Sequence, residues 1–391
     1  MSKEIVYANE ILPVMVELLD IPQSYYEKTV ARHKAFGEWM HRKESVVAKF
    51  SPEIYPQGSF RYGTVIRPLT AAEEYDLDTV CQVSLSKKRV SQKNVKDLVG
   101  HEVKAYAVAN GMDEPAREKN RCWRLDYADD VNFHMDILPA VPDQDFQNRL
   151  LLLEVAGGVA AGAIAITDRR HPRYAQVCDE WLVNNPKGYA LWFEGRMRRT
   201  AQLLLESCGA MTIHASVDRL PVYAWKTPLQ RAVQILKRHR DVMFKDDPDG
   251  KPISMIITTL AGRCYEGEIG LYEALVNIVQ KMPMWVRDEA PRIANPVCPD
   301  EDFADKWRRD SNLEDNFWAW HAQVQQDLVA LPQQLDEGHL RRFLREKFAG
   351  DVASDRARMI LGAASAASVS RVSAPTVVSI KDPPRPWSID G

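Results

Sequence analysis

The sequence predicts a mixed α/β protein in which a sheet-containing core is joined to a helical lobe. Two observations predict this fold. Short β-like runs recur between residues 54 and 142, and they are clearest at 76–84 and 132–141. After about residue 190, apolar residues instead recur at the three- and four-residue steps of helices. A chain of 391 residues is long enough for two or three domains with hydrophobic cores.

The first elements follow in order along the chain. Residues 10–48 contain two stretches with helical periodicity, and the Ser51-Pro52 step ends the second of them. Residues 94–110 form another helical pattern, which stops before Gly111, a residue type favoured just after helices. Residues 121–137 are expected to form a hairpin with two adjacent aspartates near its turn.

The rest of the chain is predicted to be mostly helical. Helices are expected at 193–208, 227–243, 252–265, 269–281, 311–330 and 337–349. The last residues are rich in Ala, Ser, Val and Pro and have no amphipathic period, so we expect a mobile tail. The predicted units are N-terminal helices packing across both lobes (1–50), the sheet-containing core (51–190), the helical lobe (191–361) and the tail (362–391).

Charge and composition exclude several classes of protein. The 51 Lys and Arg residues against 54 Asp and Glu give a net charge of −3, which argues against a protein built mainly to coat nucleic acid. The longest apolar stretch, 150–166, is interrupted by Glu154 and is shorter than the roughly 20 residues of a membrane helix, so no membrane span is expected. The acidic N-terminus is unlike a signal peptide. Six scattered cysteines indicate free thiols in a reducing cytoplasm, without a zinc site.

The first candidate motif is Gly58-Ser59, which follows a strand-like stretch and precedes a turn into a helix. A glycine lets backbone N–H groups approach an anion closely, and the serine hydroxyl adds a hydrogen-bond donor. A plain turn explains the same two residues, so the motif alone is a weak signal.

The second candidate is the Asp76-Leu77-Asp78 run. In a strand, residues i and i+2 project from the same face, so both carboxylates point one way while Leu77 enters the core. Two carboxylates so close repel each other unless a cation lies between them, and oxygen ligands of this kind suit Mg²⁺ or Mn²⁺. The alternative is a solvated strand end.

The third candidate is Asp136, an acid embedded in apolar residues on a predicted central strand. A buried carboxylate without a partner is costly, so we expect a counter-ion, and a structural salt bridge is the alternative to a functional role. His134 shares its face, but a single histidine is more often structural and is left out of the chemistry. Taken together, the anion-holding turn, the paired acids and the third acid match the layout of a two-metal phosphoryl-transfer site.

Longer motifs around these residues resemble one family. They are PQGSFRYGTVIRP (56–68), YDLDTVC (75–81), HMDILPAVP (134–142), NNPKGYALWF (184–193), TPLQRAVQILKRHRD (227–241) and NPVCPDEDFADKW (295–307). In this order they resemble the bacterial cGAS/DncV-like nucleotidyltransferases of CBASS antiphage defence, members of the DNA polymerase β-like superfamily. The resemblance spans about residues 50–310.

The resemblance implies a polymerase β-like core and a helical second lobe as in oligoadenylate synthetases. It implies an enzyme that joins NTPs such as ATP and GTP into a cyclic oligonucleotide, with two Mg²⁺ ions (or Mn²⁺) held by Asp76, Asp78 and Asp136. The product, a purine cyclic dinucleotide such as cGAMP or cyclic di-GMP, would activate a CBASS effector protein. No zinc-ribbon insertion is visible, so activation by duplex DNA is not expected. A linear oligonucleotide synthetase, or an enzyme that modifies RNA ends or a protein, remains an alternative.

The resemblance also assigns further residues. Lys237 would contact the donor triphosphate and Ser254 would assist, against the alternative of a solvated basic helix face. Asp168 lies where relatives approach a nucleobase. A carboxylate there can accept from N1–H and N2–H of guanine, although a helix N-cap would explain it equally well. The C-terminal Gly391 is similar to substrates that E1/E2-like proteins of some CBASS operons conjugate to a target amine, and an incidental disordered end is the alternative.

Overall fold

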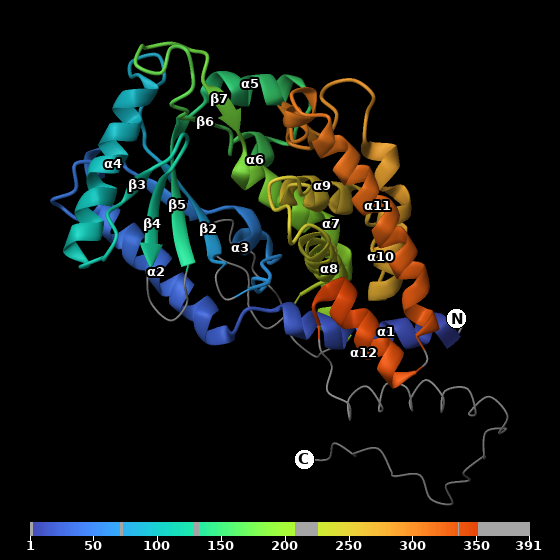
Figure 1. The fold of residues 1–391 in the computed structure, drawn as a ribbon. Helices are drawn as coiled ribbons and strands as arrows, with labels where there is room; N and C mark the ends of the chain where they lie inside the picture. The colour runs from blue at the N-terminus through green and yellow to red at the C-terminus, as the bar shows by residue number, and fades with distance from the viewer. Residues whose placement is uncertain (1–2, 71–72, 128–132, 208–225, 335, 351–391) are drawn as a thin grey trace, which may run out of the picture.

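The computed structural model describes the chain except residues 1–2, 71–72, 128–132, 208–225, 335 and 351–391. The turn of the predicted hairpin and the predicted tail with Gly391 therefore lie outside the described residues. The rest forms a mixed sheet with flanking helices on one side and a lobe of helices on the other (Figure 1).

The strands are β1 (Glu53–Pro56), β2 (Tyr75–Gln82), β3 (Arg117–Glu118), β4 (Trp123–Tyr127), β5 (Phe133–Pro142), β6 (Ile164–Ile166), β7 (Leu182–Asn184), β8 (Ala294–Asn295) and β9 (Cys298–Asp302). The helices of the first half are α1 (Lys3–Leu19), α2 (Gln23–His41), α3 (Gly58–Tyr62), α4 (Gln92–Ala109), α5 (Gln144–Leu152) and α6 (Gly157–Ala160). Those of the second half are α7 (Pro186–Ser207), α8 (Pro228–Met243), α9 (Ser254–Cys264), α10 (Leu271–Lys281), α11 (Asn312–Ala330) and α12 (Glu337–Phe348). Short 3₁₀ turns lie at Ala48–Phe50, Met282–Trp285, Asp305–Arg308 and Leu331–Gln333.

The large sheet has seven strands, of which β1-β2-β5-β4-β3 form one path and β6 and β7 continue from β5. The central strands β2 and β5 are parallel, and the other pairs are antiparallel. The prediction of a sheet-containing core joined to a helical lobe is confirmed. The β4–β5 pairing also confirms the predicted hairpin. Strand β5 has neighbours on both edges, and eight of its ten residues are buried.

The two N-terminal helices contact different parts of the molecule. Helix α1 packs on α8 and α10, and its Ile11 and Met15 belong to the core of the helical lobe. Helix α2 packs on α4, and its Phe36 and Met40 belong to the core beneath the sheet. The chain therefore links the lobes at its beginning, while the division into domains stays a prediction.

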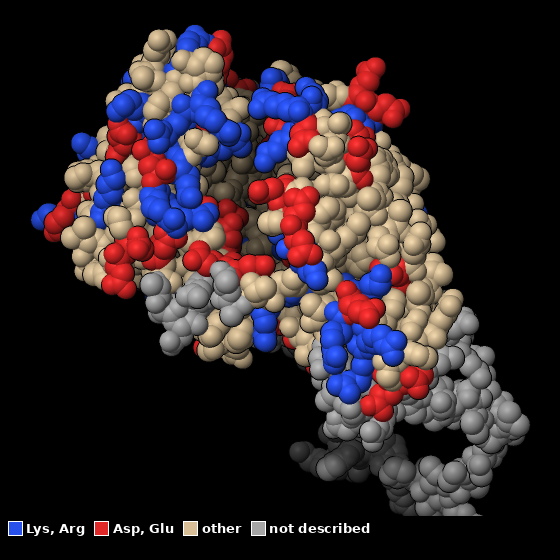
Figure 2. All heavy atoms as spheres, in the orientation of Figure 1, with Lys and Arg blue, Asp and Glu red and all other residues tan. Residues whose placement is uncertain are grey.

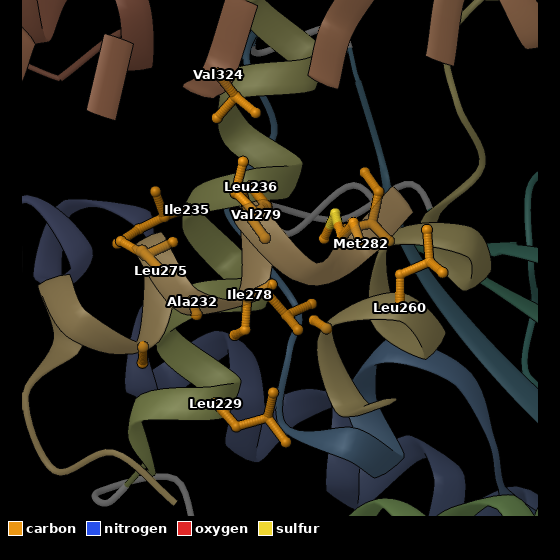
Figure 3. Close-up of a cluster of buried hydrophobic side chains, with 14 of the residues drawn as sticks. Leu229, Ala232, Ile235, Leu236, Leu260, Leu275, Ile278, Val279, Met282 and Val324 are labelled. Atoms are coloured by element: carbon orange, nitrogen blue, oxygen red, sulfur yellow. The ribbon is translucent and has the colours of Figure 1, made fainter. Parts of the chain in front are cut away.

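The helical lobe has its own apolar core (Figure 3). Its centre is made by completely buried side chains of α8 and α10, among them Ile235, Leu236, Leu275 and Ile278. Helices α8 to α12 begin no more than two residues from their predicted starts. No helix in the described parts combines the length and apolarity needed for a membrane span.

Helix α7 begins at Pro186, seven residues before the predicted start at 193. The reason is a cap: the Asn185 side-chain oxygen accepts a hydrogen bond from the backbone N–H of Gly188 at 2.9 Å. Proline at the first helical position needs no hydrogen bond of its own. The Asn-Pro pair was thus a helix-start signal that the periodicity analysis missed.

Candidate active site

The three predicted acids lie side by side because β2 and β5 pair in parallel. Asp78 is directly opposite Asp136 in the strand register, and Asp76 is opposite His134. Leu77, between the two aspartates of β2, is completely buried on the other face, as predicted. The sheet therefore presents the acids from neighbouring strands on one face.

Asp78 lies in an electrostatically unfavourable environment, because it is partly buried beside two other acids. Burial, followed by the charges of Asp76 and Asp136, raises its pKa well above the ordinary value. Positive charges on Arg124 and Lys237 act in the opposite direction. A cation bound between these carboxylates would relieve the same repulsion, so the site is electrostatically prepared for one.

The expected counter-ion of Asp136 is Arg124. The two residues are opposite each other in the antiparallel pairing of β4 and β5. The Arg124 Nε and Nη2 atoms donate to the two carboxylate oxygens at 2.7 Å each, which is the bidentate geometry of the strongest ion pairs. This pair holds the Asp136 carboxylate in one orientation at the edge of the acidic cluster.

His134 belongs to the site, although sequence reasoning left it out. Its Nε2 lies 3.1 Å from the Asp76 carboxylate, and its Nδ1 lies 2.8 Å from that of Glu74. Asp76, His134 and Asp136 each offer one ligand atom, and these atoms lie within 4.8 Å of one another. Carboxylate oxygens with an imidazole fit a divalent cation such as Mg²⁺ or Mn²⁺. The sequence signal that could have identified His134 is its i, i+2 spacing to Asp136, which places both side chains on one face of the strand.

The Gly58-Ser59 turn is fixed against the acidic strand. Gly58 has φ +67°, and a Cβ atom there would overlap the Asp78 carboxylate, so two independent constraints require glycine. The backbone N–H of Gln57 donates to the Asp78 carbonyl at 2.8 Å. Ser59 is partly exposed in the first turn of α3, and α3 contacts β2.

Helix α8 holds the segment that follows this turn. Four of its side chains donate to backbone carbonyls between residues 62 and 67: Gln230 to Tyr62, Gln234 to Val65, Lys237 to Thr64 and Arg238 to Arg67. The helix itself starts with a capping box between Thr227 and Gln230. The predicted basic motif therefore forms a row of contacts along the chain beside the site.

Lys237 is almost completely buried in this row. Its Nζ donates to the Thr64 carbonyl at 2.9 Å. Burial, assisted by the nearby charge of Arg240, lowers its pKa to about 7. The positive charge of Lys237 also acts to lower the pKa of Asp78.

A hollow separates the sheet lobe from the helical lobe on the face shown in Figure 2. Acidic and basic side chains both gather along its walls. Charged residues of opposite sign facing one cleft suit a ligand that carries both phosphates and hydrogen-bonding rings.

The chain is similar to a known protein family and to several named relatives. A family model described as the nucleotidyltransferase domain of cyclic GMP-AMP synthase DncV-like proteins matches residues 52–139. The c-di-GMP synthase of Roseivirga ehrenbergii is 30% identical over 303 residues, which cover 76% of this chain and 73% of that protein. The chain belongs to the DncV-like nucleotidyltransferases. It is therefore an enzyme, as the motifs predicted.

Other members of the family extend the likeness. The cyclic dinucleotide synthase CdnG of Bradyrhizobium diazoefficiens is 24% identical over 336 residues, or 81% of this chain and 74% of that protein. A solved structure of that CdnG in complex with GTP superposes with a TM-score of 0.64 at 21% identity, covering 91% of this chain and 97% of the other. The predicted nucleotidyltransferase fold with a helical lobe is confirmed.

The remaining predicted residues of this nucleotidyltransferase have defined partners. Ser254 is the first residue of α9, and its hydroxyl accepts a hydrogen bond from Arg240 Nη1 at 3.0 Å. Asp168 pairs with Arg121 Nε at 2.9 Å and accepts the backbone N–H of Arg170 at 2.9 Å. Asp168 therefore caps a turn, because no helix of the described structure begins there. The nucleotide-contacting roles of Ser254 and Asp168 stay predictions.

Proposed function

We propose that this nucleotidyltransferase joins two purine nucleoside triphosphates into a cyclic dinucleotide. The observation that carries the proposal is the register that puts Asp76, Asp78 and Asp136 together beside the Gly58-Ser59 turn. The relatives described as c-di-GMP synthase and as cyclic dinucleotide synthase support the cyclic product. The GTP complex of CdnG supports a guanine nucleotide as substrate.

In each of two rounds, a ribose hydroxyl attacks the α-phosphorus of the other nucleotide. A new P–O bond forms, the bond to pyrophosphate breaks, and the hydroxyl proton leaves to solvent. Asp76, Asp78 and Asp136 would hold two Mg²⁺ ions, or Mn²⁺, with His134 alongside. When bound, such ions stabilise charge on the phosphate and lower the pKa of the attacking hydroxyl.

The chain itself supplies binding and orientation. The backbone of Gly58 and the hydroxyl of Ser59 approach the triphosphate, and Gly58 keeps that approach free of side-chain atoms. Lys237 would exchange its contact with the Thr64 carbonyl for the triphosphate, whose negative charge favours the protonated amine. Ser254 would add a hydrogen bond from the start of α9.

The biological setting is part of the same proposal. We infer that the product activates a CBASS effector in the cytoplasm, and that an E1/E2-like partner conjugates the chain through Gly391. Both follow from the resemblance of the sequence to CBASS enzymes. A comparison of phage protection with and without Gly391, in cells that carry the neighbouring genes, tests the conjugation independently of catalysis.

Incubation with α-labelled GTP and ATP, singly and together, and with Mg²⁺ tests the synthesis. The expected result is a labelled product that resists phosphatase, and nuclease P1 then reports its linkage. Asp76→Asn/Asp78→Asn should abolish this product, whereas Asp97→Asn, an exposed acid of α4 paired with Lys93, should not. A phosphatase-sensitive product would indicate a linear oligonucleotide synthetase, and label transferred to RNA or protein would indicate a modifying enzyme.

A further inference from the structure

A row of charged side chains crosses four strands of the large sheet. Asp78 of β2 is opposite Asp136 of β5. Asp136 is in turn opposite Arg124 of β4, which is opposite Arg117 of β3. Residues directly opposite each other in neighbouring strands project from the same face of a sheet. The face that carries the acidic cluster therefore continues into two arginines, which lie one and two strands beyond Asp136.

Each of these arginines uses one side of its guanidinium within the protein. Arg124 donates to Asp136 through Nε and Nη2. Arg117 donates through the same two atoms to Asp126 of β4, at 2.8 and 2.6 Å. The Nη1 group of neither arginine makes a hydrogen bond to the described residues. Like charges directly opposite each other destabilise a strand pair, so the two remaining donor groups suit an anion that binds both.

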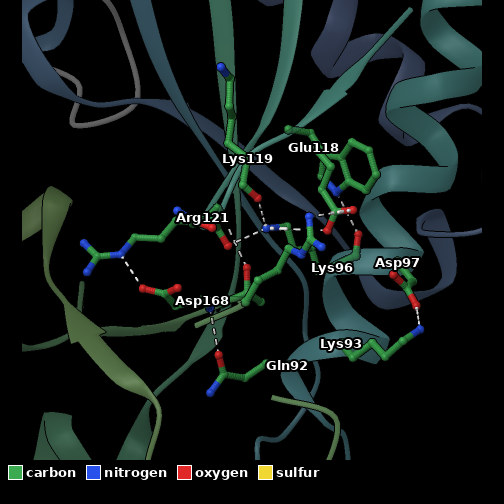
Figure 4. Close-up of polar contacts among 12 residues, drawn as sticks. Gln92, Lys93, Lys96, Asp97, Glu118, Lys119, Arg121 and Asp168 are labelled. Atoms are coloured by element: carbon green, nitrogen blue, oxygen red, sulfur yellow. Dashed lines mark hydrogen bonds and ion pairs between the residues drawn. The ribbon is translucent and has the colours of Figure 1, made fainter. Parts of the chain in front are cut away.

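The hairpin that carries both arginines is held by helix α4, as Figure 4 shows. Lys96 of α4 is completely buried, and its Nζ donates to the turn carbonyls of Lys119 and Asn120 at 2.5 Å each. Trp123 Nε1 donates to the Lys96 carbonyl at 3.0 Å. The Trp123 ring lies so close to Gly100 of α4 that a Cβ atom there would overlap it. These contacts fix the start of β4, and Arg124 is the next residue.

The order of the strands indicates which nucleotide the arginines meet. In the path β1-β2-β5-β4-β3, the Gly58-Ser59 turn follows β1 and lies against Asp78, on one side of the acids. Arg124 and Arg117 lie on the other side. The attacking and leaving oxygens of phosphoryl transfer are roughly in line with the phosphorus. With the pyrophosphate held at the Gly58-Ser59 turn, the attacking nucleotide therefore lies towards the arginines.

We propose that Arg117 and Arg124 bind the 5′-phosphates of the attacking nucleotide. This inference rests on the proposed function. Neighbouring strands are about 4.8 Å apart, so the arginines follow Asp136 at one and two such steps. A nucleotide whose hydroxyl attacks beside Asp136 extends its 5′-phosphates along this row. Guanidinium groups bind phosphate through strong charge-assisted hydrogen bonds. In the first round, the arginines thus hold the triphosphate that becomes the donor group when the ring closes.

Donors that cannot attack isolate the first round. A labelled nucleoside triphosphate without ribose hydroxyls can donate its nucleotide but cannot accept one. At saturating donor, GTP, GMP and guanosine are compared as acceptors. The wild-type enzyme should prefer GTP to guanosine in kcat/KM. Arg117→Met should reduce this preference by about 10-fold or more, the effect of losing a hydrogen bond to a charged group. Its kcat/KM for guanosine should stay near the wild-type value.

The matched control is Arg169→Met. The Arg169 side chain is 49% exposed against 51% for Arg117, and it also pairs with an acid, Glu118, but it belongs to no strand. Its ratio of GTP to guanosine should equal that of the wild-type enzyme. Arg117→Lys keeps the charge and should keep part of the preference. Arg124 is not substituted in this test, because its loss would also release Asp136.

The possible outcomes separate the two proposals. A wild-type protein that joins no nucleotides, with ordinary or dideoxy donors, contradicts the proposed function itself. A wild-type protein that uses GTP and guanosine equally well as acceptors overturns only the inference on the arginines. The same holds if Arg117→Met keeps the wild-type ratio of GTP to guanosine, because the arginine would then serve only to pair with Asp126.

Discussion

The acidic strands and helix α8 meet at the same site but are organised differently. Asp76, Asp78 and Asp136 owe their positions to the pairing of two adjacent strands, which fixes side chains by register alone. The polar side chains of α8 are instead fixed by hydrogen bonds to the backbone of another segment, as with Gln234 and Lys237. One half of the site follows from regular secondary structure, and the other depends on tertiary contacts.

This difference has a physical consequence. The acids repel one another, so the folded protein tolerates them at a cost that their removal would relieve. The α8 side chains satisfy buried carbonyls, so their removal leaves unpaired polar groups. Substitutions in the acidic half should therefore separate activity from stability, whereas substitutions in α8 should affect both.

The largest effect is expected for Asp76→Asn/Asp78→Asn. Loss of the carboxylates removes metal-borne stabilisation of the transition state, so product formation should fall by roughly 1,000-fold or more. The thermal unfolding midpoint should stay equal or rise, because the repulsion around Asp78 is gone. Parallel activity assays and calorimetry check this prediction. A large drop in the unfolding midpoint would contradict the comparison between the two halves.

Gly58→Ala should have the next largest effect. The positive φ and the overlap with the Asp78 carboxylate displace the turn, and misplacement by about 1 Å can lower a rate about 100-fold. Gly111→Ala is the matched control, since Gly111 has φ +60° but open space around its missing Cβ. Both variants should lose stability through backbone strain, and only Gly58→Ala should lose most of its activity. Equal activity in the two variants would argue against the close approach at Gly58.

Lys237→Met should weaken nucleotide binding and change the pH dependence of stability. Burial lowers the pKa of Lys237 from its ordinary 10.5 to about 7, so the unfolded chain binds more protons between these pH values. The lysine therefore makes wild-type stability rise with pH across that window. The variant lacks this contribution, so its unfolding free energy relative to wild type should decline from pH 7 to pH 10. Urea titrations across this range check it, and a constant difference between the two proteins would refute it.

The smallest effect is expected for Gln234→Leu. The change leaves the buried Val65 carbonyl without its donor at 2.7 Å, which should cost about 1–3 kcal/mol of unfolding free energy. Activity should fall only severalfold, because the acids are untouched. Gln144→Leu, an exposed glutamine of α5, is the control and should leave both quantities near wild type. Urea unfolding and steady-state assays measure both.

The acidic half was predictable from sequence because strand alternation places Asp76 and Asp78 on one face without further information. The role of Arg124 as counter-ion required the β4–β5 register, which the sequence does not specify. For Lys237, the family motif indicated a basic residue at the site but not its contact with the Thr64 carbonyl. That contact joins residues 173 positions apart. Periodicity cannot reveal contacts that depend on how two lobes pack.

The same limit applies to the contact made by Asp168. The sequence indicated a carboxylate near a base, and Asp168 was the residue that the resemblance offered. Only the folded chain shows that Asp168 pairs with Arg121. Asp168 and Arg121 are 47 positions apart in the sequence, so no local pattern connects them.

One measurement tests most directly whether the strand acids serve catalysis and helix α8 serves nucleotide binding. It is the rate of pyrophosphate release by Asp136→Asn and by Lys237→Met across a wide range of GTP concentration. The strand acids are proposed to act on the reaction itself, so Asp136→Asn should stay near background at every GTP concentration. Lys237 is proposed to act on binding, so Lys237→Met should recover much of the wild-type rate as GTP rises. Recovery of Asp136→Asn at high GTP would contradict the assignment of the strand acids to catalysis.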